Sequence, residues 1–297
     1  MVEVDAARKD FKSMAWNGIG FRTPESWEVL RLGKNYLLLE SHGRPTMEVK
    51  WGKIRGRFSA ARQLKRLAAA SRKAPEPLRT MAIPQSWRLA LASYEASAFT
   101  WADQRLKARG VLLYCTVCRQ ACLVQFFSPC GGLAQDDASQ ILDSFWDHPV
   151  DKLVEWRVFD IGLRLPRRYE LDRFRFEPGR YRIDFKASGQ VVTMLRWGPA
   201  DALMGSGGLP AFAAERIDMA HDKWRDFSLP AGTALQWQNP STAAVSIWKK
   251  LMAPMQVQAA RIWHLPEKNR ILAVTIQARR PPDDRPLNSI CNNYAVY

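Results

Sequence analysis

The chain has 297 residues, 47% of them hydrophobic, and a formal net charge of +15. Its length exceeds that of most domains with a single core, and its hydrophobic content excludes an intrinsically disordered protein. No apolar run approaches the roughly 20 residues that a spanning helix requires, and charged residues interrupt the first apolar ones. We therefore expect a cytoplasmic protein with no membrane insertion.

Two stretches of the chain are repeated. Residues 19–29 (IGFRTPESWEV) return as residues 161–171 (IGLRLPRRYEL), and residues 49–52 (VKWG) return as residues 195–198 (LRWG). The offset is 142 residues at the first match and 146 at the second, a drift that loop insertions produce. A period near half the chain length indicates two tandem domains, since solenoid units are only about 20 to 50 residues long.

The two predicted domains, residues 1–149 and residues 150–297, share the positive charge almost equally, with net charges of +8 and +7. We expect them to pack as an internal pseudo-dimer in a monomeric protein. A basic surface on both halves favours anionic partners through long-range attraction, whether an acidic protein, nucleic acid or a lipid surface.

The first copy begins with three expected strands, over residues 27–32, 36–40 and 46–51, which form an antiparallel meander because turn-type clusters separate them. Helical spacing follows. Ser59 is the predicted N-cap of a helix whose apolar face includes Leu64.

Further strands are expected over residues 98–101, 111–114 and 122–127, and the copy ends in a helix over residues 138–145. The second copy repeats the order of elements. Its strands are expected over residues 169–174, 181–185, 191–197, 260–264 and 270–278, and its helices over residues 210–224 and 287–294.

Runs of strands followed by amphipathic helices predict an α+β fold, with an antiparallel sheet covered by helices in each half. The sequence resembles the PsbP-like (Mog-type) family in two motifs. The first is Gly20-x-Arg22-x-Pro24 followed by an aromatic-Glu-aliphatic strand, and the second is a later strand that ends in Trp51-Gly52. The resemblance implies two tandem α/β/α sandwich domains. It also implies an adaptor or accessory protein without a catalytic centre, and it designates no site residues.

The histidines give no sign of catalysis. They lie far apart in the sequence, and none belongs to a metal-binding His pair: they are His42, His148, His221 and His264. We therefore predict a protein that is not an enzyme and has no cofactor, and that binds an acidic macromolecular partner, in the first place a protein.

The charge is concentrated in residues 50–73, which contain no acidic side chain. The nine basic residues are Lys50, Lys53, Arg55, Arg57, Arg62, Lys65, Arg66, Arg72 and Lys73. The equivalent helix of the second copy instead carries Glu215, Asp218 and Asp222. The basic segment is thus the candidate contact surface, for an acidic protein or, alternatively, for nucleic acid. A solvated helix face in a basic protein is the simpler interpretation.

The cysteines are a third possibility, a zinc- or thiol-dependent protein. Cys115 and Cys118 have the spacing of a zinc knuckle, which Cys122 or Cys130 would complete. The alternative is that cysteines fill buried positions in an apolar segment. Aligning Arg119 with Arg270 shows no second Cys-x-x-Cys in the other copy, so the fold itself does not need one.

Overall fold

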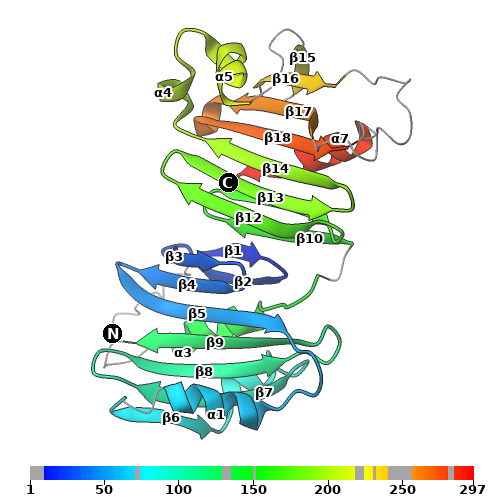
Figure 1. Cartoon of the computed structure of the whole chain (residues 1–297). Helices are drawn as coiled ribbons and strands as arrows, with labels where there is room; N and C mark the ends of the chain where they lie inside the picture. Colours follow the sequence, from blue (N-terminus) through cyan, green and yellow to red (C-terminus); the bar gives the residue numbers. More distant parts are fainter. Residues whose placement is uncertain are drawn as a thin grey trace. The chain divides into compact units, whose positions relative to one another are not determined.

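The computed structural model describes residues 10–70, 74–128, 135–149, 152–217, 224–229, 232–239, 256–279 and 284–297. The chain divides into two compact units, Met1–Asp160 and Ile161–Tyr297 (Figure 1). This division lies beyond the predicted boundary after residue 149, because strand β10 (Leu153–Val158) pairs with β1 (Phe11–Trp16) of the first unit.

The first unit is built on a seven-stranded antiparallel sheet with the strand order β3–β4–β5–β9–β8–β7–β6. Its register places Val49, Val124 and Val111 opposite one another on β5, β9 and β8. Opposite residues of antiparallel strands lie on one face, so these fully buried valines form an apolar row across the centre of the sheet. The strands are β3 (Glu28–Gly33), β4 (Tyr36–Ser41), β5 (Arg44–Lys53), β6 (Glu76–Met81), β7 (Glu95–Ala102), β8 (Lys107–Tyr114) and β9 (Gln120–Ser128).

Helix α1 (Ala60–Ala70) lies across the other face of this sheet (Figure 1). Its buried Leu64 packs in one cluster with Phe99, Leu112 and Leu123. Leu123 precedes Val124 along β9, and successive side chains of a strand point to opposite faces. Both faces of the central strands are therefore covered.

A hairpin and two short helices pack on the face of the sheet that carries Val49, Val124 and Val111. Strands β1 and β2 (Ile19–Pro24) meet at Asn17 and Gly18, whose positive φ angles of 45° and 89° suit the tight turn of a two-residue hairpin. The indole Nε1 of Trp51 donates a hydrogen bond to the Asn17 carbonyl at 3.1 Å. Helices α2 (Gln85–Arg88) and α3 (Gln135–Asp143) complete the unit, and Trp87 of α2 contacts Phe126.

The second unit contains a seven-stranded antiparallel sheet with the equivalent strand order, β12–β13–β14–β18–β17–β16–β15. In addition, β11 pairs with β19. The strands of this unit are β11 (Ile161–Pro166), β12 (Glu170–Glu177), β13 (Arg180–Ala187), β14 (Gln190–Trp197), β15 (Arg225–Leu229), β16 (Gly232–Gln238), β17 (Gln256–Leu265), β18 (Arg270–Ala278) and β19 (Tyr294–Val296).

The likeness of the two sheets extends to an irregularity. In the first unit the register of β3 and β4 shifts between Val29 and Arg31, and in the second the register of β12 and β13 shifts between Leu171 and Arg173. A bulge leaves one residue unpaired and bends the strand. The two bulges lie 142 residues apart, which is the offset of the first sequence match. The repeated sequence therefore forms the same local structure twice.

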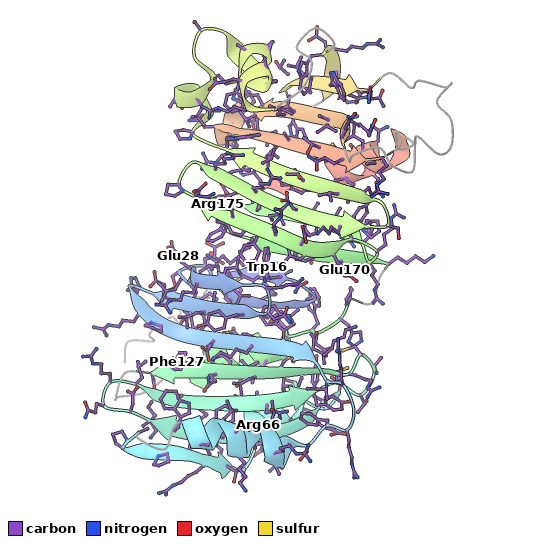
Figure 2. The ribbon with its side chains drawn as sticks, viewed as in Figure 1. Trp16, Glu28, Arg66, Phe127, Glu170 and Arg175 are labelled. Carbon is purple, nitrogen blue, oxygen red and sulfur yellow. The ribbon has the colours of Figure 1, made fainter. Side chains whose placement is uncertain are left out.

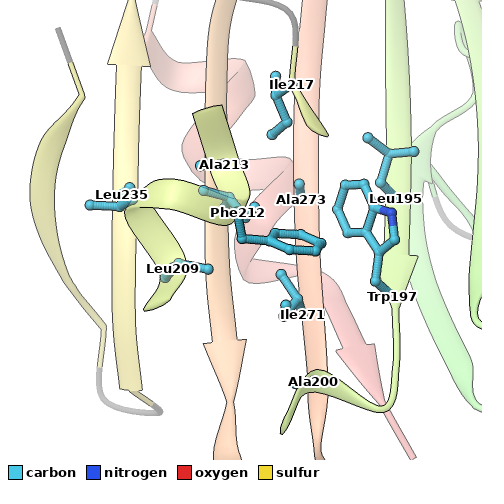
Figure 3. Packing of buried hydrophobic residues seen from close by; sticks show 11 residues of the cluster. Leu195, Trp197, Ala200, Leu209, Phe212, Ala213, Ile217, Leu235, Ile271 and Ala273 are labelled. Carbon is cyan, nitrogen blue, oxygen red and sulfur yellow. The ribbon is translucent and has the colours of Figure 1, made fainter. Parts of the chain in front are cut away.

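The core of the second unit lies between its sheet and helix α5 (Gly208–Arg216) (Figure 3). Phe212 of α5 packs edge to face on Trp197, with ring centroids 5.3 Å apart. Leu195 and Ala273 lie beneath it on β14 and β18. The other helical segments in the described part of this unit are α4 (Ala200–Met204), the 3-10 turn η2 (Pro266–Lys268) and α7 (Asp284–Asn292).

The prediction of two α/β/α sandwiches, each with a sheet covered by helices, is wrong. The described residues are mostly β, in large antiparallel sheets with few helices. Seven strands spaced about 4.8 Å apart span roughly 29 Å, whereas α1, at about 1.5 Å per residue, is about 16 Å long. Short helices therefore cover only part of each sheet. The helix expected over residues 210–224 is also too long, since α5 ends at Arg216.

A close backbone approach at Gly20 gives a first prediction. Gly20 bridges Trp146, and a Cβ atom at Gly20 would lie 2.2 Å from Trp146 Cζ2. Gly20→Ala should therefore lower the free energy of unfolding by about 1–3 kcal/mol, the usual range for overpacking. Gly52→Ala is the control, because no atom lies within 4 Å of a Cβ there, and it should change stability by less than about 0.5 kcal/mol. Urea unfolding of both variants measures the difference, and equal effects would contradict the packing argument.

Candidate functional site

The basic segment predicted from residues 50–73 lies at the end of β5, in the following loop and on α1. Lys50 and six further basic side chains of the segment are exposed; the six are Lys53, Arg55, Arg57, Arg62, Lys65 and Arg66. Arg72 and Lys73 lie outside the described residues. We call these six residues the basic face.

Helix α1 presents part of the basic face because its two sides differ in polarity. Ser59 caps the helix as predicted, since its Oγ accepts a hydrogen bond from the Arg62 amide at 3.3 Å. Leu64 points into the core, while Arg62, Lys65 and Arg66 lie three and four residues apart on the exposed side, where Arg66 is seen in Figure 2. Within the described part of the chain, no carboxylate forms an ion pair with these three residues.

Lys50 differs from the six residues of the basic face because it forms an ion pair with Glu48. Its Nζ lies 2.9 Å from Glu48 Oε2 and 5.5 Å from the centre of the Tyr36 ring. The Glu48 carboxylate also accepts a hydrogen bond from Gln125. We therefore leave Lys50 out of the basic face.

Among the described residues of the second unit, no helix has such a face. Helix α5 carries one basic residue, Arg216, which pairs with the neighbouring Glu215 at 3.2 Å. A surface pocket of about 420 Å³ in this unit does gather arginines, one of which, Arg175, is labelled in Figure 2. There Arg175 pairs with Glu177 at 2.6 Å, and Arg182 pairs with the buried Asp184 at 2.9 Å. The positive charge of that pocket is thus partly neutralised within it.

The predicted cysteine pair lies on the turn between β8 and β9. The Cys115 amide donates to the Gln120 carbonyl at 2.9 Å, and the Arg119 amide donates to the Cys115 carbonyl at the same distance. These bonds close a tight turn in which Arg119 adopts a left-handed conformation with φ of 58°. Cys115 is buried, and Cys118 is partly exposed.

The structure brings two further ligand-type side chains to this turn, Asp147 and His148. Together with Cys115 and Cys118 they form a group whose potential ligand atoms all lie within 4.8 Å of one another. Cys118 Sγ is 3.0 Å from Asp147 Oδ2, and Cys115 Sγ is 3.8 Å from His148 Nδ1. We call these four residues the thiol cluster.

The sequence analysis did not name Asp147 and His148, and it considered Cys122 or Cys130 as the further ligands. Cys122 is free and buried on β9, and it is not one of the four clustered residues. Cys130 lies outside the described residues. The adjacent Asp147-His148 pair was the available sequence signal, but only the fold shows that it faces the cysteine turn.

Burial and hydrogen bonding disfavour the thiolate form of Cys118. Burial, and then the hydrogen bond to Asp147, raise the pKa of the Cys118 thiol to about 12. Burial also raises the pKa of Cys122 and of Tyr94, whose hydroxyl donates to Asp147 Oδ1 at 3.4 Å. Without a metal, Cys118 is therefore a neutral thiol at pH 7 that donates to the Asp147 carboxylate.

A Cys-His-Asp catalytic relay does not fit this geometry. In such a relay one ring nitrogen of the histidine contacts the nucleophile, and the other contacts the carboxylate. Here the same atom, His148 Nδ1, is 3.8 Å from Cys115 Sγ and 2.8 Å from Asp147 Oδ1. The four groups instead form a compact cluster whose potential ligand atoms lie within 4.8 Å of one another.

Comparisons with known proteins add little. No family model matches the chain, and no curated protein does. A solved structure from Bacteroides thetaiotaomicron VPI-5482 is similar over 52% of this chain and 53% of its own, with 14% sequence identity and a TM-score of 0.30. Among the described residues, no helix has the length and apolar character needed to cross a bilayer.

The left-handed residue at the cysteine turn yields a second prediction. Asn269 holds the matching place in the turn between β17 and β18, with φ of 52°. Asn tolerates this conformation, whereas a β-branched residue does not. Arg119→Asn and Arg119→Val both lose the Arg119 side chain, but only the Val variant should lose a further 1–2 kcal/mol or so of stability. Denaturant unfolding in the presence of a chelator measures the difference, and equal stability of the two variants would contradict it.

Proposed function

We propose that the protein is a non-enzymatic, cytoplasmic binding protein whose basic face contacts an acidic protein. The observation that carries this proposal is the exposed side of α1, where Arg62, Lys65 and Arg66 have no carboxylate partner among the described residues. The second unit has an equivalent sheet, and its helix α5 carries a single basic residue, so a sheet of this kind does not require a basic helix against it.

The surroundings of the basic face favour a protein partner over single-stranded nucleic acid. Single-stranded nucleic acid binding usually combines a basic groove with exposed aromatic rings on which bases stack. The aromatic residues nearest to α1 serve the interior instead. Phe58 stacks on Tyr114 with centroids 4.2 Å apart, and Trp101 donates to Gln125 and packs edge-on against Phe127. An acidic protein surface, by contrast, can bind through ion pairs between its carboxylates and the exposed cations, without aromatic rings.

Charge reversal tests the proposal. The triple variant Arg62→Glu, Lys65→Glu, Arg66→Glu should bind immobilised polyglutamate at least about tenfold more weakly than the unaltered protein, since three attractions of about 0.2–1 kcal/mol each become repulsions. Binding of the unaltered protein should also fall with added salt, because exposed charges are screened.

A matched control changes the same amount of charge elsewhere in the first unit. Arg88, Arg105 and Lys107 are exposed and lie outside the basic face, and replacing all three by Glu should weaken polyglutamate binding much less. The same proteins are tested on single-stranded and duplex oligonucleotides. Tighter binding to an oligonucleotide, lost only in the first triple variant, would favour the nucleic-acid alternative. Equal losses in both triple variants would show that net charge, not the basic face, controls binding.

A further inference from the structure

We infer that the first unit binds one zinc ion through four side chains from two segments: Cys115, Cys118, Asp147 and His148. The inference goes beyond the proposed function, because it rests on the thiol cluster and not on the basic face. It also replaces the predicted ligands Cys122 and Cys130.

The separations within the cluster suit a tetrahedral ion. Bonds of about 2.3 Å to sulfur and about 2.0–2.2 Å to nitrogen and oxygen place the ligand atoms of zinc roughly 3.3–3.8 Å apart. The separations here include 3.0 Å between Cys118 and Asp147 and 3.8 Å between Cys115 and His148. His148 Nδ1 and Asp147 Oδ1 are 2.8 Å apart, and all the potential ligand atoms lie within 4.8 Å of one another, so shifts of about 1 Å would bring them to the distances that zinc requires.

The donor types also select the metal. Two thiolates, an imidazole and a carboxylate suit zinc, whereas magnesium and calcium prefer oxygen ligands alone. Four protein ligands leave no open position for a reacting water, which is typical of a structural site. The zinc would thus stabilise the first unit without making the protein an enzyme.

Neighbouring polar groups hold the carboxylate segment in place. Gln120 Nε2 donates to the Asp147 carbonyl at 3.0 Å, and the Tyr94 hydroxyl donates to an Asp147 carboxylate oxygen. Asp147 and Gln120 are both buried, so these bonds are shielded from solvent. Such partners orient metal ligands and raise metal affinity.

The second unit provides an internal comparison for the cysteine turn. Matching the left-handed residues Arg119 and Asn269 aligns the two turns, and this corrects by one residue the earlier alignment of Arg119 with Arg270. Leu265 then occupies the position of Cys115, and Lys268 that of Cys118. A turn of the same length, with its left-handed residue at the matching place, thus forms without either thiol, although the Asn269 amide bonds the carbonyl three residues back and the Arg119 amide bonds the one four residues back.

The other two ligands are also absent from the second unit. Gly20 bridges Trp146 in the first unit, and the equivalent Gly162 pairs with Ala295 in the second. Asp147 and His148 follow Trp146, and the residues that follow Ala295 are Val296 and Tyr297. All four ligand positions therefore differ together, although the backbone arrangement is shared. This is the pattern expected of a metal site that one unit has and the fold does not need.

The experiment measures zinc in the full chain, purified without a polyhistidine tag. We expect about one equivalent of zinc per chain. After removal by a chelator, zinc added back should bind with submicromolar affinity in competition with a chromophoric chelator. Cobalt(II) added instead should give the intense visible bands of a tetrahedral site with thiolate ligands. Less than a tenth of an equivalent, together with no competition by the reduced metal-free protein, would overturn the inference.

Single substitutions identify the ligands. Cys115→Ser, Cys118→Ser, Asp147→Asn and His148→Gln should each weaken zinc binding by more than about 100-fold, since loss of a supporting group alone costs 10- to 100-fold. Cys122→Ala and Cys291→Ala are the controls, because these buried thiols lie outside the cluster, and both should keep full zinc. Full zinc in Asp147→Asn and His148→Gln, or its loss in Cys122→Ala, would overturn the ligand assignment.

Two further measurements keep the test independent of folding and of oxidation. The competition titration uses the unaltered protein, so it stands even if a variant fails to fold. Mass spectrometry of alkylated protein shows whether Cys115 and Cys118 form a disulfide. If the two cysteines form a disulfide, and the protein still binds no zinc after the disulfide is reduced, the inference is overturned. If added zinc protects both thiols from alkylation, the inference is supported.

Discussion

The central strands of each seven-stranded sheet need cover on both faces, and this requirement organises the first unit. Val49 and Val124 line one face, and Leu123 with Leu112 lines the other, so neither face can be left to water. Helix α1 covers part of the leucine face with a single apolar stripe. Because only one side of α1 is needed for packing, its other side is free to carry Arg62, Lys65 and Arg66. The proposed contact surface is thus a by-product of how the core is closed.

The cysteine turn connects the two regions proposed to have a function. The Ile54 amide donates to the Arg119 carbonyl at 2.9 Å, and Arg119 Nη2 donates to the Gly56 carbonyl at 2.9 Å. Arg119 directly follows Cys118, and Gly56 lies between two residues of the basic face, Arg55 and Arg57. The loop that leads into α1 is therefore held by the same turn that carries both thiols of the cluster.

Local features of the fold could be predicted from the sequence, and the architecture could not. Turn residues located the meander strands, and Ser59 marked the start of α1, because these signals act within a few residues. The Asn17-Gly18 signal for the β1–β2 hairpin was present but not used. The fold-class prediction was wrong because the sequence does not show how small the helices are compared with the width of the sheets they pack on. The sequence also did not show that Asp147 and His148 join the cysteine turn, because Cys118 is 29 residues from Asp147 and the pairing of Gly20 with Trp146, just before Asp147, forms only in the fold.

The two turns that match at Arg119 and Asn269 give this molecule an unusual experimental convenience. One unit has four candidate ligands and the other has leucine, lysine, valine and tyrosine at those places, on a sheet of the same strand order. In every sample the second unit, which has other residues at these four positions, is therefore present at the same concentration and in the same solvent as the first unit. Backbone NMR signals or exchange rates that respond to zinc in one half of the chain can be calibrated against the silent half.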